Sequence, residues 1–191
     1  MSQAAEQRAN ALLRRALSHW QLWVVAGMAG GAVALWAPPG PMAPVVIASA
    51  VALVPLALID IETHRLPNAL VGGLGGITVV SMLVIGFATG SPYRLASSLF
   101  GGLALGLCYV APALLSPGAM GGGDVKLAAV LGLTAGWFGV NAWLWLLVTP
   151  FVIGGVLGAV GLASRRLTWT AALPFGPALA LGYVVASTCG F

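Results

Sequence analysis

Few residues of this sequence could carry chemistry, because only four of its 191 residues are carboxylic acids: Glu6, Asp60, Glu62 and Asp124. Asp60 ends one long apolar stretch, and Asp124 opens another. An acid at the edge of a membrane-spanning segment is costly, and it therefore marks a candidate functional site. If Asp60 and Asp124 lie at the same depth, one charged and one protonated carboxyl group can act together on a water molecule. The spacing therefore favours hydrolytic chemistry by an aspartyl dyad.

The composition places the elements around these acids in a membrane. The chain is 60% hydrophobic and 6% charged, and its mean hydropathy is +1.01. A soluble domain carries about 25% charged residues, and a disordered chain has fewer apolar residues, so both classes are excluded. Two cysteines are too few for a structural zinc site or a disulfide framework. We expect no metal, no organic cofactor and no nucleic-acid partner.

Seven apolar stretches of about 20 residues predict seven transmembrane helices, because a helix needs about 20 residues to cross a bilayer. The stretches lack the two-residue alternation of barrel strands, so the predicted fold is all-α. The predicted helices are residues 20–36, 42–61, 69–89, 95–115, 125–140, 142–163 and 171–189. Residues 1–19 are polar and basic, and we interpret them as a cytoplasmic tail before a single transmembrane domain, residues 20–191.

The basic residues orient the predicted bundle. With the tail inside, one basic residue, Arg94, lies on the outer side, and the other seven lie on the inner side. The inner residues are Arg8, Arg14, Arg15, Arg65, Lys126, Arg165 and Arg166. The positive-inside rule therefore predicts a cytoplasmic N-terminus and an outer C-terminus. In this topology Asp60, Glu62 and Asp124 all lie on the cytoplasmic side, as a shared site requires.

Each aspartate also has a purely structural explanation. Asp124 could cap the helix that it opens, with Lys126 reaching for the interface. Asp60 could form an interfacial ion pair with His64 or Arg65, which would contribute under about 1 kcal/mol. Together, the two acids favour the dyad. The helix dipoles predict that Asp124, at a helix N-terminus, activates the water, and that Asp60, near a helix C-terminus, is the neutral acid.

Three motifs resemble those of the type IV prepilin peptidase family. The family's first aspartate motif is similar to DIETHRLPN at residues 60–68, and its second, of the GxGD type, is similar to GGGDVKL at residues 121–127. The proline–glycine motif that begins the family's last span resembles PFGPALALG at residues 174–182. The resemblance extends over residues 42–189.

The resemblance implies a membrane aspartyl protease that cleaves the basic leader of prepilins or pseudopilins after a glycine. It implies a bacterial inner-membrane location with the active site facing the cytoplasm, and prepilin and membrane lipid as partners. Asp60 and Asp124 match the catalytic pair. Residues expected to bind substrate or shape the site are Glu62, Lys126, Pro67, Gly121, Gly123, Pro174 and Gly176. Glu62 could attract the basic leader, or it could pair with Arg65 or His64.

Larger members of the family carry a cytoplasmic insert with paired CxxC motifs, which is associated with N-methylation. This sequence has no CxxC motif and no internal loop long enough for such an insert, so we predict cleavage without methyl transfer. That is typical of the small peptidases of Flp/Tad-type pili, and Asn68 favours the same branch. The Pro-Phe-Gly-Pro run is more typical of the larger members, so the subfamily stays open.

Three other functions fit parts of the pattern. A transporter could use Asp60, Asp124 and Lys126 as an ion or proton relay, although these groups cluster at one face and no inverted repeat is visible. A catalytically silent assembly factor would not need an intact acid pair. A presenilin-like protease shares the GxGD pattern, but there a tyrosine precedes the first aspartate, where this chain has Ile59.

Overall fold

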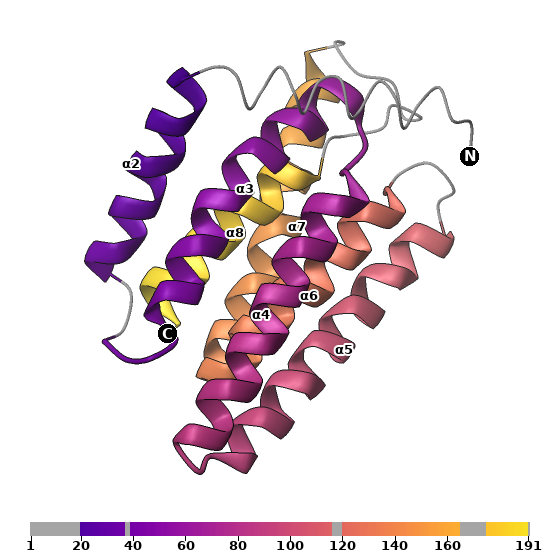
Figure 1. Cartoon of the computed structure of the whole chain (residues 1–191). Helices are drawn as coiled ribbons and strands as arrows, with labels where there is room; N and C mark the ends of the chain where they lie inside the picture. The colour runs from indigo at the N-terminus through magenta and orange to yellow at the C-terminus, as the bar shows by residue number, and fades with distance from the viewer. Residues whose placement is uncertain (1–19, 37–38, 116–119, 165–174, 191) are drawn as a thin grey trace.

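The computed structural model describes residues 20–36, 39–115, 120–164 and 175–190, which form seven α-helices and no strand (Figure 1). The helices are α2 (Trp20–Trp36), α3 (Ala43–Thr63), α4 (Asn68–Ala88), α5 (Pro92–Leu115), α6 (Gly122–Phe138), α7 (Val140–Ala163) and α8 (Gly176–Cys189). The all-α fold expected from the sequence is confirmed. The predicted tail, residues 1–19, lies outside the described residues.

Four of these helices, α3, α4, α5 and α7, are long and apolar enough to cross a membrane. The other three are shorter, with 17 residues in α2 and in α6 and 14 in α8. At 1.5 Å per residue, α8 is about 21 Å long, against about 30 Å for the hydrocarbon core of a bilayer. The structure is that of a polytopic membrane protein, while the count of seven spans and the orientation of the termini stay predictions.

Short connections make consecutive helices antiparallel and bring key ends together. Helix α3 ends because His64 adopts a left-handed conformation (φ 50°, ψ 34°), and its N–H donates to the carbonyl oxygen of Asp60 at 2.8 Å. Pro67 then precedes α4 as its N-cap residue, in an extended conformation that its fixed φ allows. As a result, the end of α3 and the starts of α4, α6 and α8 lie at one end of the bundle, the upper end in Figure 1. We call this the aspartate end.

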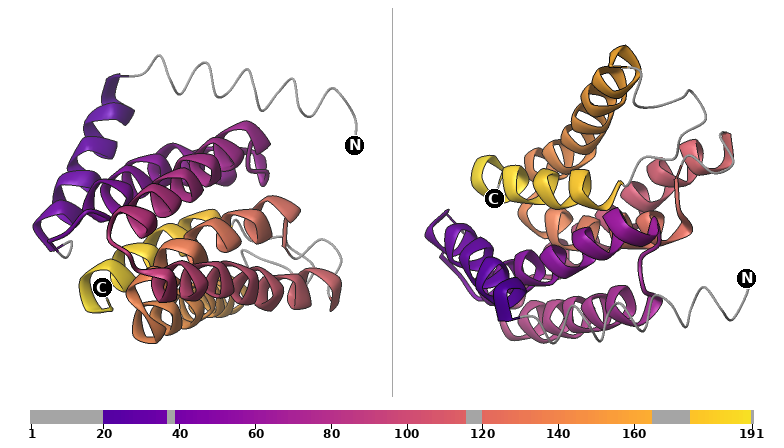
Figure 2. Two further views of the ribbon diagram at one scale, coloured as in Figure 1. Left: turned by 60° about the horizontal axis from the view of Figure 1, so that its bottom comes forward. Right: turned by 90° about the horizontal axis from the view of Figure 1, so that it is seen from above.

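Helix α6 lies at the centre of the bundle and packs against α3, α4, α5, α7 and α8. Figure 2 shows α2 on the outside of the bundle, beside α3. The contact between α5 and α6 is close because glycines meet there. A Cβ atom on Gly132 would lie 2.7 Å from the carbonyl oxygen of Gly101, and one on Gly136 would lie 2.5 Å from that of Ser97. Small residues at four-residue spacing therefore allow the backbones to touch.

Glycines at four-residue spacing do not mark a close helix–helix contact everywhere in the bundle. At Gly27, Gly31, Gly72 and Gly76, a Cβ atom would meet no described atom of another helix within 4 Å. The packing role that their spacing predicts is therefore not seen between the described residues.

Candidate active site

Asp60 is held at the aspartate end by a residue far away in the sequence. The side chain lies in the last turn of α3 and is 2% exposed. Its Oδ2 accepts a 2.7 Å hydrogen bond from the N–H of Gly176, 116 residues later. Gly176 is the first residue of α8, and a helix begins with N–H groups that have no partner inside the helix. The start of α8 is therefore a natural donor to the Asp60 carboxylate.

Only glycine fits at position 176 without a rearrangement. A Cβ atom there would lie 2.8 Å from Oδ2 of Asp60 and 2.9 Å from its Cβ. The missing side chain of Gly176 thus allows the α8 backbone to approach the carboxyl group directly.

Asp124 is the third residue of α6 and is 5% exposed. The N–H of Gly121 donates to its Oδ2 at 3.1 Å, and the N–H of Asp124 donates to the carbonyl oxygen of Gly121 at 3.0 Å. Asp124 therefore closes the first turn of α6 from inside the helix, as in a capping box. Its other oxygen, Oδ1, is buried and has no hydrogen-bond partner among the described residues. The cap engages one oxygen and leaves the other available.

Asp60 and Asp124 lie on helices α3 and α6, which contact each other and both pack against α8. Asp60 and Asp124 are close enough to interact electrostatically. The loop after α3 lies against the start of α6, since a Cβ atom on Gly123 would lie 2.8 Å from Cβ of Leu66. Both aspartate motifs therefore lie in one contact region of the bundle.

The other predicted residues lie around this pair. Pro67 is buried at the start of α4. Lys126 is exposed, and its Nζ donates to Oδ1 of Asn68 at 3.0 Å, which joins the two motifs a second time. Pro174 lies outside the described residues.

Glu62 is exposed on the last turn of α3. Within the part of the chain that the structure describes, it forms no ion pair with His64 or Arg65. The sequence allows two roles for Glu62, attraction of a basic leader and a local ion pair. The local ion pair is not seen among the described residues.

The environment of Asp60 differs from the one that the sequence suggested. The neutral role predicted for Asp60 used the dipole of α3 alone, whose C-terminus disfavours a negative charge. The N-terminus of α8 also points at Asp60 and donates a short hydrogen bond, and both features favour the charged form. Because the two helix ends act in opposite directions, the dipole argument no longer distinguishes Asp60 from Asp124.

Sequence reasoning missed an aromatic cluster beside the pair. The ring of Tyr109 in α5 lies 4.9 Å from that of Phe151 and 5.8 Å from that of Phe175. Phe175 directly precedes Gly176. No sequence signal distinguished Tyr109, because one aromatic residue in a long apolar stretch is typical of any span.

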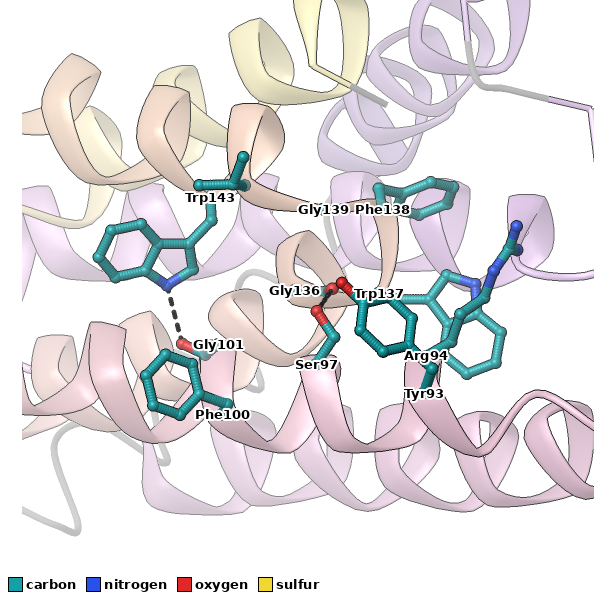
Figure 3. A pocket seen from close by; sticks show the side chains of 11 residues that line it. Tyr93, Arg94, Ser97, Phe100, Gly101, Gly136, Trp137, Phe138, Gly139 and Trp143 are labelled. Carbon is teal, nitrogen blue, oxygen red and sulfur yellow. Dashed lines mark hydrogen bonds between the residues drawn. The ribbon is translucent and has the colours of Figure 1, made fainter.

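A cavity of about 620 Å³ lies at the opposite end of the bundle, between α5, α6 and α7 (Figure 3). Its polar groups are used within the protein: the Ser97 hydroxyl donates to the Gly136 carbonyl at 2.7 Å, and Nε1 of Trp143 donates to the Gly101 carbonyl at 3.0 Å. Arg94 lies over the Trp137 ring, 5.9 Å from its centre. The lining contains neither aspartate, so this cavity is separate from the acid pair.

Among the described residues, no three His, Cys, Asp or Glu side chains come together as metal ligands would.

Comparison with known proteins gives two matches. The model of the type IV leader peptidase family matches residues 46–162, a range that contains both aspartates. The prepilin leader peptidase/N-methyltransferase of Bacillus subtilis (strain 168) is 37% identical over 90 residues, which are 47% of this chain and 35% of that protein. The chain thus matches about a third of the length of this curated relative. No solved structure matches the chain.

Proposed function

Because this chain belongs to the type IV leader peptidase family, we propose that it is a membrane aspartyl endopeptidase that removes the basic leader of a type IV prepilin or pseudopilin. The cut follows a glycine and takes place at the cytoplasmic face of the bacterial inner membrane. One observation carries the proposal: Asp60 at the end of α3 and Asp124 at the start of α6 are both buried and interact electrostatically, and Oδ1 of Asp124 has no partner among the described residues.

In this mechanism a water molecule is bound between the two carboxyl groups, which share one proton and titrate as a pair. The charged carboxylate takes a proton from the water, and the water oxygen bonds to the scissile carbonyl carbon. The protonated carboxyl group gives its proton to the carbonyl oxygen, and a tetrahedral intermediate forms. When the C–N bond breaks, the dyad gives its proton to the leaving amine nitrogen and takes one from a hydroxyl group of the intermediate, which restores both the carbonyl and the shared proton.

The exposed carboxylate of Glu62 supports the proposal that the substrate is basic, because a negative group near the site attracts positive side chains of the leader. The family topology supports it further: the leader approaches from the cytoplasm, and the apolar pilin helix lies in the membrane beside the bundle. Asn68 and the absence of CxxC motifs from the sequence favour an Flp/Tad-type prepilin and cleavage without N-methylation.

The test is cleavage of a prepilin co-reconstituted in lipid with the wild type, Asp60→Asn or Asp124→Asn. Each variant should lose at least about 1,000-fold in kcat, because removing one member of a catalytic unit removes most of its contribution. Arg94→Gln, at the opposite end of the bundle, is the control and should cleave like the wild type. Retained cleavage in Asp60→Asn or Asp124→Asn would exclude the dyad.

The same vesicles test the transporter alternative. Ion or proton flux that depends on Asp60 and Asp124, without any cleaved product, would favour transport. The bond from Lys126 to Asn68 argues against a relay, because it directs the ammonium group to an amide and not to either aspartate.

A further inference from the structure

Tyr109 in α5 has a buried hydroxyl group for which the described part of the chain offers no partner. The residue is 0% exposed, and among the described residues its hydroxyl has no hydrogen-bond partner. A buried hydroxyl without a partner is destabilising, so each case in a folded protein needs an explanation. Phenylalanine would fill the same space without this cost, which indicates that the hydroxyl serves a group that arrives later.

The register of α5 against α6 places Tyr109 at the depth of the acid pair. The two helices are antiparallel, with Gly101 against Gly132 and Gly106 against Ala129. Three residues further along α5, Tyr109 reaches the level of the first turn of α6. Asp124 lies in that turn, and Tyr109 is close enough to interact with it electrostatically.

Aromatic packing holds the Tyr109 ring in place. The Phe151 ring packs against it at 4.9 Å with an interplanar angle of 41°, and the Phe175 ring meets it edge-on at 5.8 Å and 74°. Phe175 is next to Gly176, the residue whose N–H binds Asp60. Tyr109 therefore lies between the helix that carries Asp124 and the segment that holds Asp60.

A donor of this kind complements the pair of aspartates. As water adds to the scissile carbonyl, negative charge grows on the carbonyl oxygen until the protonated carboxyl group has given it a proton. A phenol keeps its proton at neutral pH, so it can donate a hydrogen bond throughout the reaction. In a water-poor site, one such donor changes kcat by about 100- to 1,000-fold.

We propose that the Tyr109 hydroxyl donates a hydrogen bond to the scissile carbonyl oxygen, so that Tyr109 is a third catalytic residue beside Asp60 and Asp124. This inference rests on the peptidase function proposed above. It adds an electrostatic contribution from α5 to a reaction otherwise assigned to α3 and α6.

The test compares Tyr109→Phe with the wild type in the prepilin cleavage assay. We expect kcat to fall about 100-fold and KM to stay unchanged, because the bond strengthens only as charge develops. The melting temperature should not fall, since the variant keeps the ring and removes a hydroxyl that has no partner within the described ranges. Tyr183→Phe is the matched control: Tyr183 is also fully buried, its hydroxyl lies near Ser49 and Thr134, and its loss should leave kcat unchanged.

Fluorinated tyrosines at position 109 separate catalysis from packing, because they keep the hydroxyl and nearly the same shape. A more acidic phenol is a stronger donor, so kcat should rise with phenol acidity while the phenol stays protonated. If Tyr109→Phe does not fold, the fluorotyrosine series alone tests whether the Tyr109 hydroxyl contributes to kcat.

Three outcomes would count against the proposal. Wild-type kcat in Tyr109→Phe, or a fluorotyrosine series without any trend, would refute the role of Tyr109 alone, provided that Asp60→Asn and Asp124→Asn are inactive. A wild-type protein that cleaves no prepilin would refute the proposed function, and the role of Tyr109 with it.

Discussion

Replacing Gly176 by alanine would place a methyl group against the carboxyl group of Asp60. The new Cβ atom would lie 2.8 Å from Oδ2 of Asp60, 2.9 Å from its Cβ and 3.1 Å from its Cγ. Carbon atoms pack at about 3.5–4.0 Å, so the two groups would have to move apart by roughly 0.5–1 Å. That movement would lengthen the 2.7 Å hydrogen bond from the Gly176 N–H to Oδ2.

The expected effect on the rate is larger than the effect on stability. Misplacing a catalytic group by about 1 Å can lower a rate about 100-fold, so we expect Gly176→Ala to lose about 10- to 100-fold in kcat. Overpacking costs about 1–3 kcal/mol, whereas alanine is better than glycine in a helix by about 1 kcal/mol. The free energy of unfolding should therefore fall by only about 0–2 kcal/mol.

The assay measures kcat and KM for prepilin cleavage and the thermal unfolding of the same samples. Gly72→Ala in α4 is the matched control, because a Cβ atom at position 72 would meet no described atom of another helix within 4 Å. It should cleave like the wild type and be more stable by up to about 1 kcal/mol. Wild-type kcat in Gly176→Ala would refute the reasoning, because the contact with Gly176 would then not position Asp60.

Other regions give independent predictions. Gly136→Ala would force α5 away from α6 at the Ser97 carbonyl, and we expect the free energy of unfolding to fall by about 1–3 kcal/mol; an unchanged melting curve would contradict this. Asn68→Ala removes the acceptor of the Lys126 ammonium group. Because both side chains are exposed, the free energy of unfolding should fall by under about 1 kcal/mol. A larger loss would mean that this bond holds the two motifs together. Glu62→Gln should raise KM for a basic leader and weaken its dependence on salt, measured as initial rates at two ionic strengths. Equal KM values at low salt would exclude contact between Glu62 and the leader.

The helices and the candidate acid pair could be predicted from the sequence because both depend on local properties. A backbone in lipid must form its hydrogen bonds within its own segment, so a long apolar stretch has to be a helix. Successive helices run in opposite directions when their connections are short. Asp60 at the end of α3 and Asp124 at the start of α6 must then lie at the same end of the bundle.

Which atoms meet at that end was decided only by the tertiary structure. Gly72 and Gly76 have the same spacing as Gly132 and Gly136, yet a Cβ atom would meet a neighbouring helix only at the second pair. The family motif singled out Gly176, but its hydrogen bond to Asp60 and the position of Tyr109 had no signal in the sequence. The physical reason is that helices apolar on every side have no polar face, so their hydropathy leaves open how each is rotated and how far it is shifted along its neighbour. Rotation and register follow from side-chain packing between helices, and they determine which donors reach the two carboxyl groups.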